Sequence, residues 1–285
     1  MIVKIELSGS AKRDSQERLD LMMNVVDWKQ QSTARGRYST TSGNVKVIEQ
    51  FYMPQLKTHR RVWVYLPPDY EYTNERYPVL YMHDGQNLFD EATSHVGEWH
   101  IDKTLDKLFD DNILPGLIVV GIDNGRTARF DEYIPWKMGR HYACFLMHTL
   151  KPFIDRTFRT RPGRNDTGIM GSSLGGLISL YVGAKYPHIF SKIGAVSPAM
   201  CFAGDSLQGI CRQQDMRIYM DVGTKENLPY TTAEQYADDV WKTYFHLICA
   251  GFGNDEMRLI VEKDADHEEA AWSRRFAATV TWLYC

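Results

Sequence analysis

The segment TGIMGSSLGGLISLY (residues 167–181) decides the fold, because an apolar run changes there from the spacing of a strand to that of a helix. Its centre, GSSLG (residues 171–175), fits the pattern G-x-S-x-G. In that pattern a sharp strand-to-helix turn lifts the serine hydroxyl above a sheet, and glycines stand where side chains would clash. Small residues for close helix packing are one interpretation of the segment, and a nucleophile at Ser173 is the other.

The same turn could in principle bind a phosphate group. A phosphate-binding loop carries a lysine and then a serine or threonine after its last glycine. Here Leu177 follows Gly176, and the dinucleotide pattern G-x-G-x-x-G is absent. The nucleophile interpretation therefore needs support from the rest of the chain.

Short apolar runs on both sides of this segment predict buried strands, and segments with helical spacing separate most of them. This alternation predicts the α/β class: a mostly parallel, eight-stranded sheet with helices on both faces, in which the first two strands are antiparallel because their link is short. The expected strands cover residues 45–52, 60–66, 79–84, 117–123, 167–172, 192–197, 217–222 and 257–262. The expected helices cover residues 100–111, 143–158, 174–187, 232–251 and 268–284.

Length and composition indicate a globular protein with one main domain. The chain has 285 residues, of which 44% are hydrophobic, and its net charge of −3 disfavours nucleic acid as a partner. We expect residues 43–285 to form the catalytic domain and the polar residues 1–42 to form a peripheral extension.

Cysteine usage and the N-terminus predict a cytoplasmic protein. Five widely spaced cysteines without a CxxC pair are typical of free thiols in a reducing compartment. The N-terminus, MIVKIELSGSAKRD, lacks the apolar core of a signal peptide, and no stretch approaches the roughly 20 apolar residues of a membrane span. The alternative is a secreted protein whose signal peptide has been removed.

A serine needs a base, and on this type of sheet the partners follow the later strands in the order serine, acid, histidine. Of the nine histidines, only His267 follows the last expected strand. The segment YMDVGTKEN (residues 219–227) offers two acids. Glu226 is favoured because it lies in the loop after Gly223, whereas Asp221, the alternative, is still within the strand pattern.

The ester oxyanion would be bound by two backbone amides. One belongs to Leu174, directly after the nucleophile, and the other to a residue of HDGQNLFD (residues 83–90), where Gly85 permits a tight turn. Four further residues near the expected carboxyl ends of the strands are candidates for substrate binding. They are Asp84, Trp99, Trp136 and Met200.

Several motifs together resemble the esterase D-like "putative esterase" family of α/β-hydrolases, which includes enterochelin esterases, feruloyl esterases and mycolyltransferases. The motifs are RRVWVYLPPDY (60–70), RYPVLYMHDGQNLFD (76–90), GIDNGRTARFDEYIPW (121–136), GIMGSSLGGLISLY (168–181), DVGTKEN (221–227) and DADHEEAAW (264–272). The resemblance implies that Ser173 is the nucleophile, His267 the base and Glu226 the acid. It also implies that Gln86 supplies the second oxyanion amide.

The expected function is a serine carboxylic ester hydrolase that needs neither a metal nor an organic cofactor. The span between the sixth and seventh expected strands, residues 198–216, is too short for a lid domain, which predicts an open cleft for a small or a bulky, polymer-linked ester. Acyl transfer to an alcohol on the same residues is one alternative. A catalytically silent binding module of the same fold is the other, and the sequence does not indicate an oligomeric state.

Overall fold

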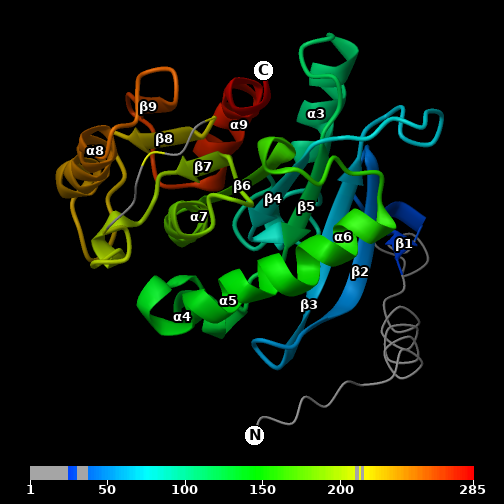
Figure 1. Ribbon diagram of the computed structural model, residues 1–285, viewed down its shortest axis with the longest axis horizontal. Coiled ribbons are helices and arrows are strands. Elements are labelled where there is room, and N and C mark those ends of the chain that lie inside the picture. Colours follow the sequence, from blue (N-terminus) through cyan, green and yellow to red (C-terminus); the bar gives the residue numbers. More distant parts are fainter. Residues whose placement is uncertain (1–24, 31–37, 209–211, 213–214) are drawn as a thin grey trace, which may run out of the picture.

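A single twisted sheet with helices on both faces organises the protein (Figure 1). The computed structural model describes residues 25–30, 38–208, 212 and 215–285. Within these residues the strands are β1 (Val26–Asp27), β2 (Asn44–Met53), β3 (Thr58–Leu66), β4 (Val79–His83), β5 (Ile118–Ile122), β6 (Thr167–Ser172), β7 (Lys192–Val196), β8 (Arg217–Gly223) and β9 (Met257–Glu262).

The strand order is β1-β2-β3-β5-β4-β6-β7-β8-β9. The pairs from β1 to β5 are antiparallel, and the pairs from β5 to β9 are parallel. The predicted mostly parallel sheet and the antiparallel first hairpin are confirmed, but the described residues contain nine strands rather than eight. The additional strand, β1, has two residues, too few for a period that sequence analysis could detect.

Helices cover the sheet in two layers (Figure 1). Apolar side chains of α5 to α8 share one buried cluster with one face of the sheet, and those of α3 and α9 share a second cluster with the other face. Because both faces are covered, β4, β5 and β6 are buried along their whole length. The helices are α3 (Ile101–Asp110), α4 (Arg129–Tyr133), α5 (Arg140–Phe145), α6 (Lys151–Thr157), α7 (Leu174–Lys185), α8 (Ala233–Cys249) and α9 (Glu269–Tyr284).

The N-terminal segment expected to be peripheral lies partly outside the described residues. In its described part, Trp28 is fully buried in the cluster beneath α3, and Thr41 is also buried. The boundary at residue 42 stays a prediction. These contacts show that the described part of the segment packs into the main core.

The strand-to-helix turn predicted from residues 171–175 lies between β6 and α7. Ser173 adopts φ 57° and ψ −120°, a conformation that L-residues rarely adopt. A Cβ at Gly171 would lie 2.8 Å from the carbonyl carbon of Gly175 and 2.9 Å from the imidazole of His83. The glycine is therefore required by the close approach of the turn to the end of β4.

No separate cap covers the sheet between β7 and β8 in the part of that connection that is described. The described residues of this connection form a short 3₁₀ turn, η6 (Met200–Phe202). Among the described residues, none of the helices has the length and apolar character of a bilayer-spanning segment.

Candidate active site

The candidate residues converge because the parallel strands end at one edge of the sheet. Ser173 follows β6, Ser197 follows β7, Glu226 follows β8 and His267 follows β9. Loops after neighbouring strands therefore bring together side chains that are up to 94 positions apart in the numbering.

His267 forms the central contact of the site. Its Nδ1 lies 2.9 Å from Oε2 of Glu226, and its side chain is 10% exposed. A neutral imidazole that donates from Nδ1 has an acceptor lone pair at Nε2, as a general base requires. The ring is held edge-on between Tyr236, at 5.3 Å, and Trp272, at 4.9 Å between centroids.

The Glu226 carboxylate is fully buried and supported on its second oxygen. Oε1 accepts hydrogen bonds from the Gly223 amide at 2.6 Å and from the Ser197 hydroxyl at 2.5 Å. The Arg275 guanidinium lies 3.9 Å away. Such donors compensate for the loss of water around a buried charge, and they fix the direction in which Oε2 faces the imidazole.

Asp221, the alternative acid, has a different environment. Its Oδ1 accepts the Ser197 amide at 2.9 Å, and Oδ2 lies 3.4 Å from Nε of Arg275. Burial raises the pKa of Asp221 to about 6, although Arg275 opposes the shift. The structure thus places Glu226 against His267, while Asp221 supports the backbone at Ser197.

Tyr236 links Ser197 to the histidine. Its hydroxyl donates to the Ser197 carbonyl at 2.7 Å. The Ser173 side chain opposes the rise in the pKa of Tyr236, which places it on the same side of the site. Burial raises the pKa of Tyr236 well above its ordinary value, so the phenol stays protonated. The Tyr236 ring therefore joins His267 to the backbone at Ser197.

The two expected oxyanion amides belong to two helical segments that follow β6 and β4. Leu174 begins α7, and Gln86 is the middle residue of the 3₁₀ turn η1 (Gly85–Asn87). The Gln86 side chain accepts the Asn124 amide at 3.1 Å, and its carbonyl accepts the Thr93 hydroxyl at 2.8 Å. These bonds restrain the turn on both sides of the Gln86 amide.

Asp84, a candidate for substrate binding, is already occupied by protein contacts. Its carboxylate accepts two hydrogen bonds from Arg129, at 2.7 and 2.9 Å, and one from Asn124 at 2.7 Å. Although burial opposes it, the Arg129 guanidinium holds the pKa of Asp84 below its ordinary value. The structure therefore gives Asp84 a role in shaping the loops beside the turn at Ser173.

The other three candidate substrate residues lie in different environments. Trp99 is 3% exposed and packs at 6.1 Å on Trp272, behind the histidine. Trp136 is 62% exposed, and its indole donates to the Phe202 carbonyl at 3.2 Å. Met200 is buried and lines a cavity of about 590 Å³ between η6 and α8.

Sequence analysis did not identify Ser197, Tyr236 or Arg275. The Ser197 hydroxyl donates to Glu226 and accepts from the Trp272 indole at 3.0 Å and from Arg275 at 3.1 Å. These partners are 29 to 78 residues away in the chain, so no local pattern indicates them.

His83 lies directly beneath the turn at Ser173 and is completely buried. Its Nδ1 lies 2.9 Å from the Tyr142 hydroxyl, and the Tyr133 and Tyr142 rings pack on it at 5.3 and 5.5 Å. Burial lowers the pKa of His83 to about 4. The folded protein therefore holds this imidazole neutral where the unfolded chain, with a pKa of 6.5, would protonate it.

This difference predicts a loss of stability in acid. As the pH falls from 6.5 towards 4, only the unfolded chain binds the proton, which lowers the free energy of unfolding by up to about 1.4 kcal/mol per pH unit. We expect His83→Asn to remove this part of the pH dependence in urea denaturation measured near neutral pH and near pH 4.5. An equal pH dependence in both proteins would contradict the assignment.

Fold and site together define the class of protein: an α/β-hydrolase with a serine at a strained strand-to-helix turn and a histidine–carboxylate pair beside it. The sequence pattern of the putative esterase family matches residues 54–283, which confirms the resemblance seen in the motifs. The chain belongs to this family and is a carboxylic ester hydrolase.

Known proteins are similar to this chain in sequence or in fold. The uncharacterized protein YbbA of Bacillus subtilis is 28% identical over 79% of this chain and 93% of its own length. A solved ferulic acid esterase superposes with a TM-score of 0.63 at 18% identity, covering 84% of this chain and 98% of its own. The enterobactin esterase of Shigella flexneri superposes with a TM-score of 0.66 at 19% identity. The match covers 86% of this chain and 60% of the enterobactin esterase.

Proposed function

We propose that the protein hydrolyses carboxylic esters through Ser173, His267 and Glu226, with a covalent acyl-enzyme intermediate. The observation that carries the proposal is the 2.9 Å contact between Nδ1 of His267 and Oε2 of Glu226. It leaves Nε2 as a proton acceptor at the edge of the sheet where the turn before α7 places Ser173.

In the first half of the reaction, Oγ of Ser173 attacks the ester carbonyl while His267 takes its proton. The Leu174 and Gln86 amides bind the oxyanion, and the imidazolium then protonates the leaving alcohol as the ester C–O bond breaks. In the second half, water attacks the acyl-enzyme with His267 as base. The carboxylic acid leaves, and the proton returns to Ser173.

Glu226 stabilises the imidazolium that forms in each half-reaction. Its carboxylate is buried, and its hydrogen bonds from Gly223 and Ser197 keep it in place without movement during the reaction. Such a fixed charge in a site of low dielectric acts more strongly than the same charge in water.

An exposed group of aromatic residues supports a cleft that accepts bulky esters. Phe202 of η6 packs against Phe130 at 5.3 Å and against Tyr230 at 5.3 Å, and its carbonyl accepts the Trp136 indole. This aromatic shelf (Phe130, Trp136, Phe202 and Tyr230) adjoins the turn at Ser173, because the neighbouring Ala199 amide donates to the Ser173 carbonyl at 3.0 Å. Flat apolar groups of a large substrate would pack on it.

The nucleophile is tested with a fluorophosphonate probe. We expect the wild-type protein to be labelled and to hydrolyse p-nitrophenyl acetate, and Ser173→Ala to lose both properties, with a fall in kcat of at least about 10³-fold. Mass spectrometry locates the label. Labelling that survives in Ser173→Ala would contradict the proposal, and an unlabelled, inactive wild type would favour a binding module.

The acid is tested with a matched pair of isosteric variants. Glu226→Gln removes the charge beside the imidazole and should lower kcat about 10³-fold or more, whereas Asp221→Asn should retain most activity because that side chain supports Ser197 instead. Steady-state kinetics and thermal unfolding of both variants separate catalysis from stability. Equal losses of activity would overturn the assignment of Glu226.

The aromatic shelf is tested with Trp136→Ala. Since the indole is largely exposed, the variant should fold normally, raise KM for a bulky aryl ester about 2- to 10-fold and leave p-nitrophenyl acetate hydrolysis unchanged. Tyr72→Ala, which removes an aromatic side chain that is 89% exposed, serves as the control. Equal KM values for the bulky ester in both variants would exclude the shelf as a substrate surface.

A further inference from the structure

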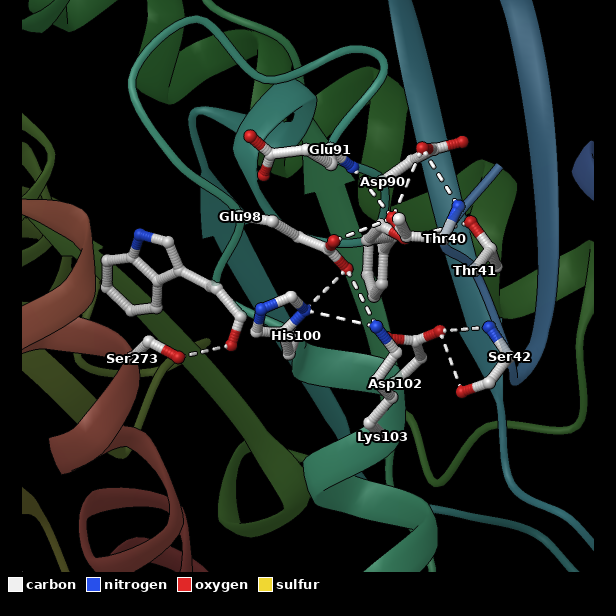
Figure 2. A network of polar contacts seen from close by, with 12 residues as sticks. Thr40, Thr41, Ser42, Asp90, Glu91, Glu98, His100, Asp102, Lys103 and Ser273 are labelled. Atoms are coloured by element: carbon white, nitrogen blue, oxygen red, sulfur yellow. Dashed lines mark hydrogen bonds and ion pairs between the residues drawn. The ribbon is translucent and has the colours of Figure 1, made fainter. Parts of the chain in front are cut away.

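A short polar segment of the N-terminal region runs along the loop that carries Gln86 (Figure 2). We call residues 39–43, with the sequence STTSG, the strap, and residues 84–100 between β4 and α3 the β4–α3 loop. The side chain of Thr40 faces acidic residues of the loop in Figure 2, and that of Ser42 faces Asp102 of α3. The proposed mechanism assigns no role to this network.

Thr40 makes the most connected contact of the strap. Its hydroxyl donates to Oε2 of Glu98 at 2.6 Å and accepts the Glu91 amide at 2.8 Å, so one side chain joins the middle of the β4–α3 loop to its last part. The neighbouring Thr41 hydroxyl donates to the Phe89 carbonyl at 2.8 Å. Valine has nearly the shape of threonine but can make neither bond at position 40.

Asp90 anchors the same loop from its middle. The side chain is fully buried, and its Oδ2 accepts from the Trp28 indole at 2.6 Å and from the Ser39 hydroxyl at 2.7 Å. Its Oδ1 accepts the Ala92 amide at 2.9 Å. Although burial opposes it, these hydrogen bonds hold the pKa of Asp90 below its ordinary value, so the strap and Trp28 stabilise its charged form.

The next strap residues fasten the end of the loop to α3. The Ser42 and Gly43 amides donate to Oδ2 of Asp102 at 2.8 and 3.2 Å. Asp102 is fully buried in the first turn of α3. The strap thus contacts the middle and the last part of the β4–α3 loop and the first turn of α3.

Inside the loop, hydrogen bonds carry these restraints to Gln86. The Thr93 hydroxyl donates to the Gln86 carbonyl at 2.8 Å, and the Thr93 amide donates to the Asp90 carbonyl at 3.1 Å. The Trp99 amide donates to the Asn87 carbonyl at 2.8 Å. Asp90 and the turn η1 are therefore parts of one hydrogen-bonded unit.

The opposite side of the loop contacts α9, which begins two residues after His267. The Asn87 amide group donates to Glu269 at 3.3 Å, and the Ser273 hydroxyl donates to the Trp99 carbonyl at 2.7 Å. The Trp99 ring packs on Trp272, which in turn contacts His267. The β4–α3 loop is thus held between the strap on one side and α9 on the other.

We propose that the strap positions the β4–α3 loop for catalysis, so that Thr40 and Asp90 are positioning residues that act through the Gln86 amide. This inference rests on the proposed esterase function. An oxyanion donor must lie within a few tenths of an ångström of its place in the transition state, and small displacements there reduce kcat without changing substrate binding. Loss of a strap hydrogen bond should therefore change kcat more than KM.

The test compares three variants of the full chain. Thr40→Val should lower kcat for p-nitrophenyl acetate about 10-fold with KM within about 2-fold, and Thr40→Ser, which keeps the hydroxyl, should restore kcat. The control is Thr160→Val, because the Thr160 hydroxyl also donates to a carboxylate, that of Asp155 at 2.8 Å, but on another part of the fold. The control should lose stability comparably and keep kcat.

Hydrogen exchange gives a readout that is independent of activity. Amides of residues 84–92 should exchange about 10-fold faster in Thr40→Val than in wild type or in Thr160→Val. Unchanged exchange, a kcat equal to that of the control, or a failure of Thr40→Ser to restore kcat would each overturn the inference.

Labelling and activity of the wild-type protein distinguish a failure of the proposed esterase function from a failure of this inference. An unlabelled and inactive wild type refutes the proposed function, while the exchange experiment still decides whether the strap orders the loop. Should Thr40→Val not fold, Ser39→Ala, which removes one hydrogen bond to Asp90, takes its place in the same comparison.

Discussion

The buried hydrogen bond between Glu226 and His267 is the contact on which the rest of the site depends. A carboxylate without water is costly unless donors surround it. Here those donors come from the end of β8 and from Ser197 after β7, and Ser197 is in turn bonded by Trp272 and Arg275 of α9. Two strand ends and one helix must therefore meet before the imidazole can be oriented.

Backbone geometry imposes a second constraint, at the turn before α7. The positive φ of Ser173 is possible because Gly171 and Gly175 let the turn approach His83 and Asp84 at the end of β4. Packing thus supports a strained conformation that the local sequence would not adopt by itself. The same contact brings the nucleophile close to the β4–α3 loop, which carries the second proposed oxyanion amide.

The β4–α3 loop connects these two constraints to the N-terminal segment. It contacts α9 through Asn87 and Trp99, and it contacts the strap through Asp90 and Glu98. A loop of this length has little regular structure to hold it, so its shape depends on side-chain hydrogen bonds from both sides. The polar composition of the strap, which suggests a surface extension when read alone, provides the hydroxyls and amides that satisfy buried carboxylates.

Local patterns in the chain were sufficient to predict the α/β class, the mostly parallel sheet and the turn at Ser173, because hydrophobic period and turn glycines are encoded by neighbouring residues. The candidates His267 and Glu226 came from their order after the later strands and from the family resemblance. The two-residue strand β1 has no such period, and it was missed. Tyr236, Ser197 and the strap contacts could not be predicted either, since each joins segments that are distant in the chain. Only tertiary packing selects the partners of buried polar groups, because every such group must find a hydrogen bond wherever the fold places it.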